Sequence, residues 1–231
     1  LLDGQIVLGN NLIDLYSHIM PKEKIYVIPN GGDYEFPLKK KQDYKSIQVL
    51  FLGNIIKSKG ALDFIKAATY LPKEYHTDLK FVIAGYTYDS KCEKDIKEII
   101  NSYPLIDFKY NGPVNGSDKV KLISNSDIFV FPTFYRNEGH PWVIVEALAA
   151  GLPIISTDHG AIIESVIDGV NGYIVKKNNP EDIALKLKLF LDNPDMIRRM
   201  GDESCILYKS KYTEQRLVEN FDKVFKTILK E

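Results

Sequence analysis

The sequence predicts an α/β fold in which helices flank a Rossmann-like parallel sheet. From residue 47 onward, short apolar runs rich in β-branched residues alternate with longer amphipathic stretches, as strand–helix units around a parallel sheet do. Glycine and proline separate most of these segments. The hydrophobic share, 45% of 231 residues, is sufficient for a buried core.

Six continuous apolar runs are expected to form the strands, because parallel strands are usually buried on both faces. They are Gln48–Leu52, Lys80–Ala84, Asp107–Tyr110, Ile128–Phe131, Pro153–Ser156 and Tyr173–Val175. Helical periodicity marks the segments that follow them. The predicted helices are Ala61–Leu71, Glu93–Ser102, Asp118–Ser124, Pro141–Ala150, Ile162–Ile167, Glu181–Leu191 and two more after Pro194.

The first thirty-three residues have a different pattern. Gln5–Leu8 and Ile25–Ile28 resemble strands, and a helix is expected around Asn11–Met20. The second strand leads into the turn Asn30–Asp33, for which a structural role is preferred. We interpret residues 1–33 as the remnant of an N-terminal domain.

A polar, lysine-rich stretch, residues 34–46, is expected to link this remnant to a second domain at 47–231. The last predicted helix, Glu214–Leu229, has apolar residues at helical spacing and therefore needs a partner for one face. We expect this helix to cross back toward the remnant. In the isolated chain it would be loosely held, self-associated or packed on residues 1–33.

Charge and cysteine content limit the class of protein. Thirty basic residues against thirty-one acidic ones leave a formal charge of -1, so no overall field favours nucleic acid or an anionic membrane. Cys92 and Cys205 lack metal-ligand or redox spacing and suit reduced thiols of a cytosolic protein. No apolar run approaches the roughly 20 residues that span a bilayer, and no signal peptide is visible.

Residues 127–157 form the segment richest in chemistry. A buried strand ends at Pro132, a loop carries Glu138–His140, a helix begins with Pro141, and Gly151 closes it. The loop should therefore lie at the carboxyl end of a parallel strand, where open α/β sheets bind ligands. A helix N-terminus there offers free N–H groups to phosphate oxygens.

Two glutamates flank this helix start. Glu146 falls on the second turn of the helix, and an ionised carboxylate, which accepts hydrogen bonds only, suits the vicinal diol of a ribose. Glu138 lies in the loop and could hold a sugar hydroxyl on the other side of the phosphates. The alternative is that both are ordinary solvated carboxylates.

These two glutamates, separated by seven residues, resemble the E-x7-E signature of the retaining glycosyltransferases of family 4. The resemblance covers nearly all of residues 25–225. Its further matches are EGHPWVIVEALAAGLPIIST, Asp158–Gly160, Glu164, Asp168–Gly172 and VLFLGNIIKSKGALDFIKAA. It implies a GT-B fold, in which two Rossmann-like domains face each other across a cleft and the C-terminal one holds most of the donor. It also implies that no divalent metal is needed, and the sequence offers no convincing DxD motif.

The resemblance assigns roles to individual residues. Glu146 would bind the ribose and Glu138 would lie near the donor sugar. Lys59, before Gly60, matches the lysine that binds the donor diphosphate and would stabilise charge on the departing nucleotide. Many relatives have arginine directly after the glycine of this strand end, whereas this chain has Asn54 after Gly53. The missing charge would then come from Lys57, from Arg136 or from the absent domain.

The remaining donor-binding candidates lie beside these residues. Gly139, His140 and Pro141 would bring backbone N–H groups to the phosphates or sugar, and the His140 side chain would either contact the donor or pack. Val114, in the loop after the third strand, would line the nucleobase by resemblance. Trp142 is expected in the core rather than as a stacking platform.

The first hypothesis is therefore a hexosyltransferase acting with retention on a nucleotide-diphosphate sugar and a glycan or lipid-linked acceptor. Glu138 and Lys59 would be its catalytic residues, and no cofactor or metal is expected. The enzyme would work in the cytoplasm, as in bacterial polysaccharide assembly, with peripheral association of the full-length protein at the inner membrane face left open. This chain would supply the donor-binding half and be inactive without its N-terminal domain.

Two other hypotheses remain. One is a non-catalytic sugar-nucleotide-binding or scaffold subunit of the same fold, for which Asn54 is the best support. The other is a GT-B relative such as an epimerase or a phosphorylase, although no context for a pyridoxal-binding lysine is visible.

Overall fold

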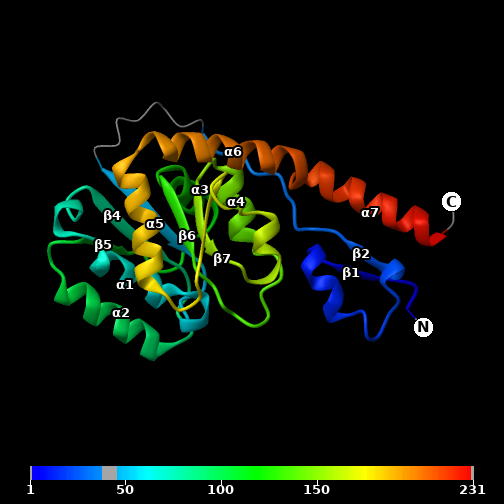
Figure 1. Ribbon diagram of the computed structural model, residues 1–231, viewed down its shortest axis with the longest axis horizontal. Coiled ribbons are helices and arrows are strands. Elements are labelled where there is room, and N and C mark those ends of the chain that lie inside the picture. Colours follow the sequence, from blue (N-terminus) through cyan, green and yellow to red (C-terminus); the bar gives the residue numbers. More distant parts are fainter. Residues whose placement is uncertain (1, 38–45, 230–231) are drawn as a thin grey trace.

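The protein is described by a computed structural model covering residues 2–37 and 46–229. Most of the predicted linker at 34–46 therefore lies outside the described residues. The molecule is elongated, with the large sheet domain at one end and the N-terminal strands beside the last helix at the other (Figure 1).

The large domain contains a six-stranded parallel sheet, as predicted. Its strands are β3 (Ile47–Leu52), β4 (Leu79–Ala84), β5 (Asp107–Tyr110), β6 (Ile128–Phe131), β7 (Ile154–Thr157) and β8 (Gly172–Val175). Each begins and ends within one residue of the expected bounds. β3, β6 and β7 lie inside the sheet and are almost entirely buried, which explains their continuous apolar sequences.

The strand order, β5-β4-β3-β6-β7-β8, contains a switch in direction. The chain runs outward from β3 to β5, then crosses back to β6 on the other side of β3 and continues outward to β8. β3 and β6 are therefore neighbours whose following connections diverge to opposite sides. Open α/β sheets bind ligands outside the carboxyl ends of the strands at such a point.

Seven α-helices complete the described chain. Their bounds are α1 (Ala61–Tyr70), α2 (Ser90–Ser102), α3 (Gly116–Ser124), α4 (Trp142–Ala149), α5 (Pro180–Asp192), α6 (Asp195–Lys211) and α7 (Glu214–Leu229). α1 packs against α2 and α5, whereas α4 packs against α6. Because connections between parallel strands are right-handed, the reversal at β3 and β6 puts α1 and α4 on opposite faces of the sheet. No helix of the described residues is long and apolar enough to cross a membrane.

Two segments that were predicted to be α-helices are not α-helical in the structure. Asn11–Met20 was expected to be helical, but the structure has a short 3-10 helix at Asn10–Leu15 followed by turns. None of its residues is buried, and short helices depend on packing for their stability. In place of the predicted helix Ile162–Ile167 the structure has a 3-10 segment, Gly160–Glu164, which is kinked at Ala161.

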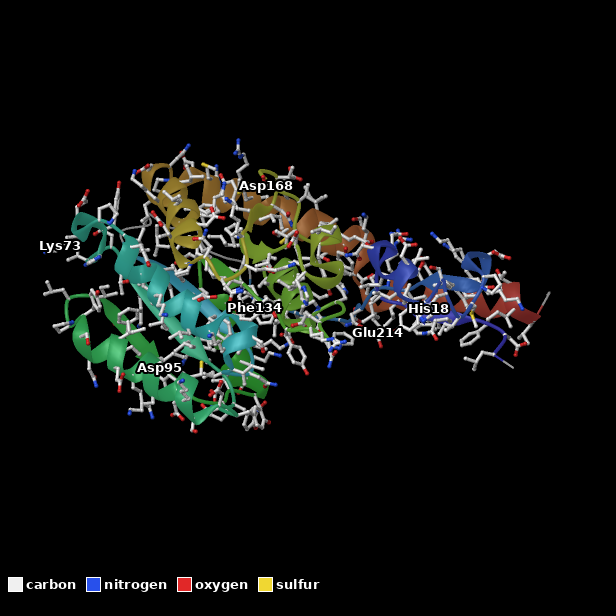
Figure 2. The ribbon with its side chains drawn as sticks, turned by 60° about the horizontal axis from the view of Figure 1, so that its bottom comes forward. His18, Lys73, Asp95, Phe134, Asp168 and Glu214 are labelled. Atoms are coloured by element: carbon white, nitrogen blue, oxygen red, sulfur yellow. The ribbon has the colours of Figure 1, made fainter. Side chains whose placement is uncertain are left out.

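The N-terminal part is a small unit of its own. β1 (Gln5–Val7) and β2 (Ile25–Val27) form a two-stranded parallel sheet, preceded at β2 by the 3-10 turn Lys22–Lys24. Figure 2 shows His18 in this part, while Lys73 and Asp95 lie at the far end of the molecule.

Helix α7 packs on the N-terminal part, which is one of the three arrangements expected for it. Val224 is buried, and a Cβ placed on Gly4 would lie 3.3 Å from Cδ1 of Ile228. Val218, Phe225 and Leu229 remain exposed. The N-terminal part therefore covers only some of the apolar residues of this helix.

Candidate functional site

The loops that follow β3 and β6 meet at the carboxyl edge of the sheet. The Phe134 N–H donates to the carbonyl of Ser58 at 2.8 Å, which joins the two loops directly. Gly60 has φ +80°, and a Cβ there would lie 2.4 Å from the carbonyl oxygen of Pro132. Glycine is therefore required for the two loops to approach this closely.

This approach brings together Lys59 and Glu138, which are 79 residues apart in the sequence. Nζ of Lys59 lies 2.5 Å from Oε2 of Glu138, with side chains 14% and 9% exposed. The Thr133 hydroxyl donates to the same oxygen at 3.2 Å, and the ammonium lies 4.8 Å from the ring centre of Tyr135. A cation and a carboxylate predicted to bind one ligand thus lie in contact at the switch point of the sheet.

The backbone between Glu138 and α4 is hydrogen-bonded to the segment that follows β7. The Ala161 N–H donates to the carbonyl of Gly139 at 2.7 Å. Gly160 has φ +56°, and a Cβ there would lie 2.4 Å from the carbonyl oxygens of both Glu138 and Gly139. Pro141 is the N-terminal cap residue of α4, so the helix begins one residue later than predicted and leaves its first N–H groups at this edge.

Glu146 lies on α4 and is almost fully buried. Its Oε1 accepts from Nζ of Lys119 at 2.5 Å, with side chains 9% and 31% exposed respectively. Its Oε2 is buried and has no hydrogen-bond partner among the described residues. Burial, together with the nearby Glu146 charge, raises the pKa of Tyr34 to about 12. Glu146 is therefore no ordinary solvated carboxylate.

His140 packs inside the protein rather than facing the sheet edge. Its Nδ1 accepts from the Asn30 N–H at 3.0 Å, so the ring proton lies on Nε2, which is 2.7 Å from Oγ of Ser165. Ser165 donates to the Tyr212 hydroxyl, which donates to the carbonyl of Glu164. Burial lowers the pKa of His140 to about 4, and this network requires its neutral form.

The other predicted residues lie around this edge without joining the ion pairs. Gly53 and Asn54 follow β3, and the Asn54 side chain is exposed with no hydrogen bond to the described residues. Val114 is half-buried after β5 and packs against the core. The prediction that Trp142 lies in the core was wrong, because its position at the start of α4 leaves it 48% exposed.

Sequence reasoning missed Lys119, Asn30 and Glu164 as structural partners of the site. Asn30 also donates from Nδ2 to the carbonyl of His140 at 2.6 Å, so the expected turn binds the loop of Glu138. Glu164 accepts from the Asn10 N–H at 2.5 Å and so supports the first 3-10 helix. For Glu164, the one indication in the sequence was its place among the residues that carry the family resemblance.

A metal site is not evident in the part of the chain that the structure describes. No group of three or more His, Cys, Asp or Glu side chains there could hold a metal ion. Lys59 and the first N–H groups of α4 are at the sheet edge and could meet an anion.

Residues 34–204 match the sequence model of the family described as glycosyl transferases group 1. The chain belongs to this family. A curated relative is the capsular polysaccharide biosynthesis glycosyltransferase CapM of Staphylococcus aureus, 27% identical over 182 residues, or 78% of this chain and 46% of CapM. The chain spans about half the length of the curated relatives it matches.

Solved structures show that this group 1 chain has the fold of GT-B glycosyltransferases. HepE of Anabaena in complex with UDP superposes with a TM-score of 0.82 at 16% identity, covering 99% of this chain and 64% of HepE. The C-terminal domain of the group 1 protein LpcC from Francisella tularensis has a TM-score of 0.68 at 24% identity. That likeness covers 78% of this chain and 96% of the LpcC domain.

Proposed function

We propose that this chain is the donor-binding half of a retaining family 4 glycosyltransferase. The enzyme would transfer a sugar from a nucleoside diphosphate to a glycan or lipid-linked acceptor. The observation that carries the proposal is the contact of Lys59 with Glu138 at the switch point between β3 and β6. Membership of the glycosyl transferases group 1 family supports the same chemistry.

The half-protein role has independent support. The chain covers 96% of the solved LpcC C-terminal domain but about half of its curated relatives. In a GT-B enzyme a second domain would provide the acceptor-binding site. The N-terminal part of this chain would belong to that domain. The isolated chain is then expected to bind donor without transferring sugar.

Each carboxylate and the lysine would have a separate task. Glu146 would accept hydrogen bonds from the ribose, and Glu138 would accept them from the donor sugar. Lys59 and the first N–H groups of α4 would bind the diphosphate and stabilise the charge that develops as the nucleotide leaves. No resident metal or other cofactor is needed for these contacts, and the acceptor hydroxyl would attack on the face from which the nucleotide departs.

Exchange of partners is the first step of binding in this scheme. In the empty site Lys59 is paired with Glu138, and both side chains are mostly buried. A diphosphate would form the ion pair with the Lys59 ammonium. The sugar hydroxyls would donate hydrogen bonds to the Glu138 carboxylate. Breaking a buried pair is unfavourable unless both partners are replaced together, so a complete donor sugar nucleotide should engage the pair better than either piece alone.

The setting proposed is bacterial polysaccharide assembly on the cytoplasmic side. CapM, the relative from Staphylococcus aureus, is named for capsular polysaccharide biosynthesis. The acceptor would then be a growing glycan or its lipid-linked precursor. Association of the full-length protein with the membrane face would be peripheral.

The test is a sugar-release assay with the full-length protein, a panel of UDP- and GDP-sugars, and EDTA throughout. Release of nucleotide that depends on an added acceptor, and that falls at least about a hundredfold in Lys59→Met, is the expected result. Abolition by EDTA in the wild type would contradict the metal-independent site.

A non-catalytic sugar-nucleotide-binding subunit is the second candidate, because Asn54 is exposed and carries no charge where many relatives have arginine. Nucleotide binding without any sugar release by the full-length protein would favour it. Lys57 and Arg136, both exposed near the site loops, are the alternative sources of charge for a catalytic protein.

A further inference from the structure

The ion pair between Lys119 and Glu146 joins two helices at the site. Lys119 lies in the first turn of α3, and its Nζ reaches Oε1 of Glu146 on α4 at 2.5 Å. Among the described residues, this pair and Lys59–Glu138 are the two contacts of a lysine with a glutamate of the E-x7-E pattern. In the remaining ion pairs of residues 2–37 and 46–229, both side chains are more exposed than these two glutamates.

The Glu146 carboxylate is only half satisfied. Lys119 supplies a donor to Oε1, but Oε2 is buried and accepts no hydrogen bond from the described residues. A buried charged oxygen is costly when no donor reaches it, so a ligand that donates a hydrogen bond to Oε2 would be favoured there. The side chain of Lys119 is 31% exposed, whereas that of Glu146 is 9% exposed, so Lys119 is the more accessible partner of the pair.

Lys119 has more donors than Glu146 uses. An ammonium carries three N–H groups, and one is directed at Oε1. A hydroxyl group both donates one hydrogen bond and accepts others. An ammonium can donate to a hydroxyl oxygen, and the adjacent carboxylate can accept the hydrogen bond that the hydroxyl donates. Two adjacent hydroxyls match this pair better than one.

We propose that Lys119 and Glu146 together form the ribose subsite, with Lys119 donating to a ribose hydroxyl that donates to Glu146. This inference rests on the proposed function, since it takes the ligand to be a nucleoside diphosphate. A ribose hydroxyl would supply the donor that Oε2 of Glu146 lacks, in addition to the contact of Lys119 with Oε1. Lys119 thus makes the site selective for ribose over 2′-deoxyribose.

The test is calorimetric titration of UDP, GDP and their 2′-deoxy forms into the chain and its variants. The variants are Lys119→Met, Lys119→Arg, Glu146→Gln and the double variant Lys119→Met with Glu146→Gln. Lys121→Met is the matched control, because Lys121 lies on the same helix but is exposed and makes no ion pair among the described residues. Circular dichroism checks that each variant is folded.

Lys119→Met should weaken binding of the preferred ribonucleotide about tenfold or more, while Lys121→Met leaves it unchanged. The preference for the ribo form over the 2′-deoxy form should shrink, and Lys119→Arg should restore part of it. In the Glu146→Gln background the loss caused by Lys119→Met should be at least threefold smaller, because the two residues bind one hydroxyl pair.

Two results overturn the inference while leaving the proposed function intact. One is undiminished affinity and ribose preference in Lys119→Met. The other is an equal loss with and without Glu146→Gln, which would reveal a general structural effect. If the wild type binds none of the four nucleotides, the proposed function itself fails and this inference fails with it.

Discussion

The large domain and the N-terminal part both contain parallel strands, but only the large domain covers them on both faces. β3 and its neighbours are enclosed between helices, with Phe51 and Phe131 fully buried. β1 and β2 have three residues each, and much of α7 beside them remains exposed. Apolar burial is the main source of stability, so the difference locates most of the folding free energy in the large domain.

Several contacts between the two regions are polar. Hydrogen bonds from Asn30 to His140, and from Asn10 to Glu164, attach the N-terminal part to the segments beneath the site. These polar contacts are specific in geometry but small in net free energy. The N-terminal part therefore buries fewer apolar side chains than the sheet domain and is hydrogen-bonded to the loop that follows Glu138.

The largest expected effect comes from the core of the large domain. Phe51→Ala should lower the free energy of unfolding by about 3 to 5 kcal/mol, because it leaves a cavity among packed aromatic rings. Phe225→Ala on α7 should cost less than about 1 kcal/mol, since Phe225 is 53% exposed. Urea unfolding of both variants measures the contrast, and equal losses would show that α7 is as well packed as the sheet.

The junction between the regions should respond to acid through His140. Its pKa is lowered by burial to about 4, so between about pH 6.5 and 4 the unfolded chain binds a proton that the folded chain does not. Stability from this group is complete above pH 6.5 and is lost as the pH falls, by about 3 kcal/mol in total. His140→Asn should remove this part of the pH dependence. The free energy of unfolding of both proteins is measured from about pH 4 to 6.5. If it changes with pH equally in wild type and variant, the burial effect on His140 is refuted.

At the site, Glu138→Gln should separate the two halves of the donor. Affinity for UDP or GDP should not fall, because Lys59 is then free for the diphosphate, while binding of the matching nucleotide sugar should lose about 1 to 2 kcal/mol of sugar contact. Titration of both ligands into both proteins measures this. The same loss for nucleotide and nucleotide sugar would remove Glu138 from the sugar subsite.

The smallest expected effect is a gain. Asn54→Arg should tighten nucleoside diphosphate binding by about 0.2 to 1 kcal/mol, since an exposed charge contributes little in water. The gain should disappear at high salt. If affinity does not rise at low salt while the fold is intact, the loop after β3 does not face the diphosphate.

The local sequence pattern was sufficient to predict the strands of the sheet. It was insufficient to predict side-chain contacts between different elements. The strands follow from apolar runs whose burial on both faces permits few other structures, and the Glu138 loop follows from its place after β6. The contact of Lys119 could not be predicted from the sequence, because its partner Glu146 lies on another helix and no spacing rule connects the two. Ile162–Ile167 had a helical pattern, but the contact of Gly160 with the carbonyls of the Glu138 loop prevails there.

The most direct test of the central claim is titration of UDP and GDP into the chain in the presence of EDTA, repeated with Glu146→Ala. The account predicts that the wild type binds at least one of the two nucleotides without metal. It also predicts that Glu146→Ala weakens this binding by about 1 to 3 kcal/mol, because the ribose loses its acceptor. Binding of neither nucleotide, or full affinity in Glu146→Ala, would contradict the account.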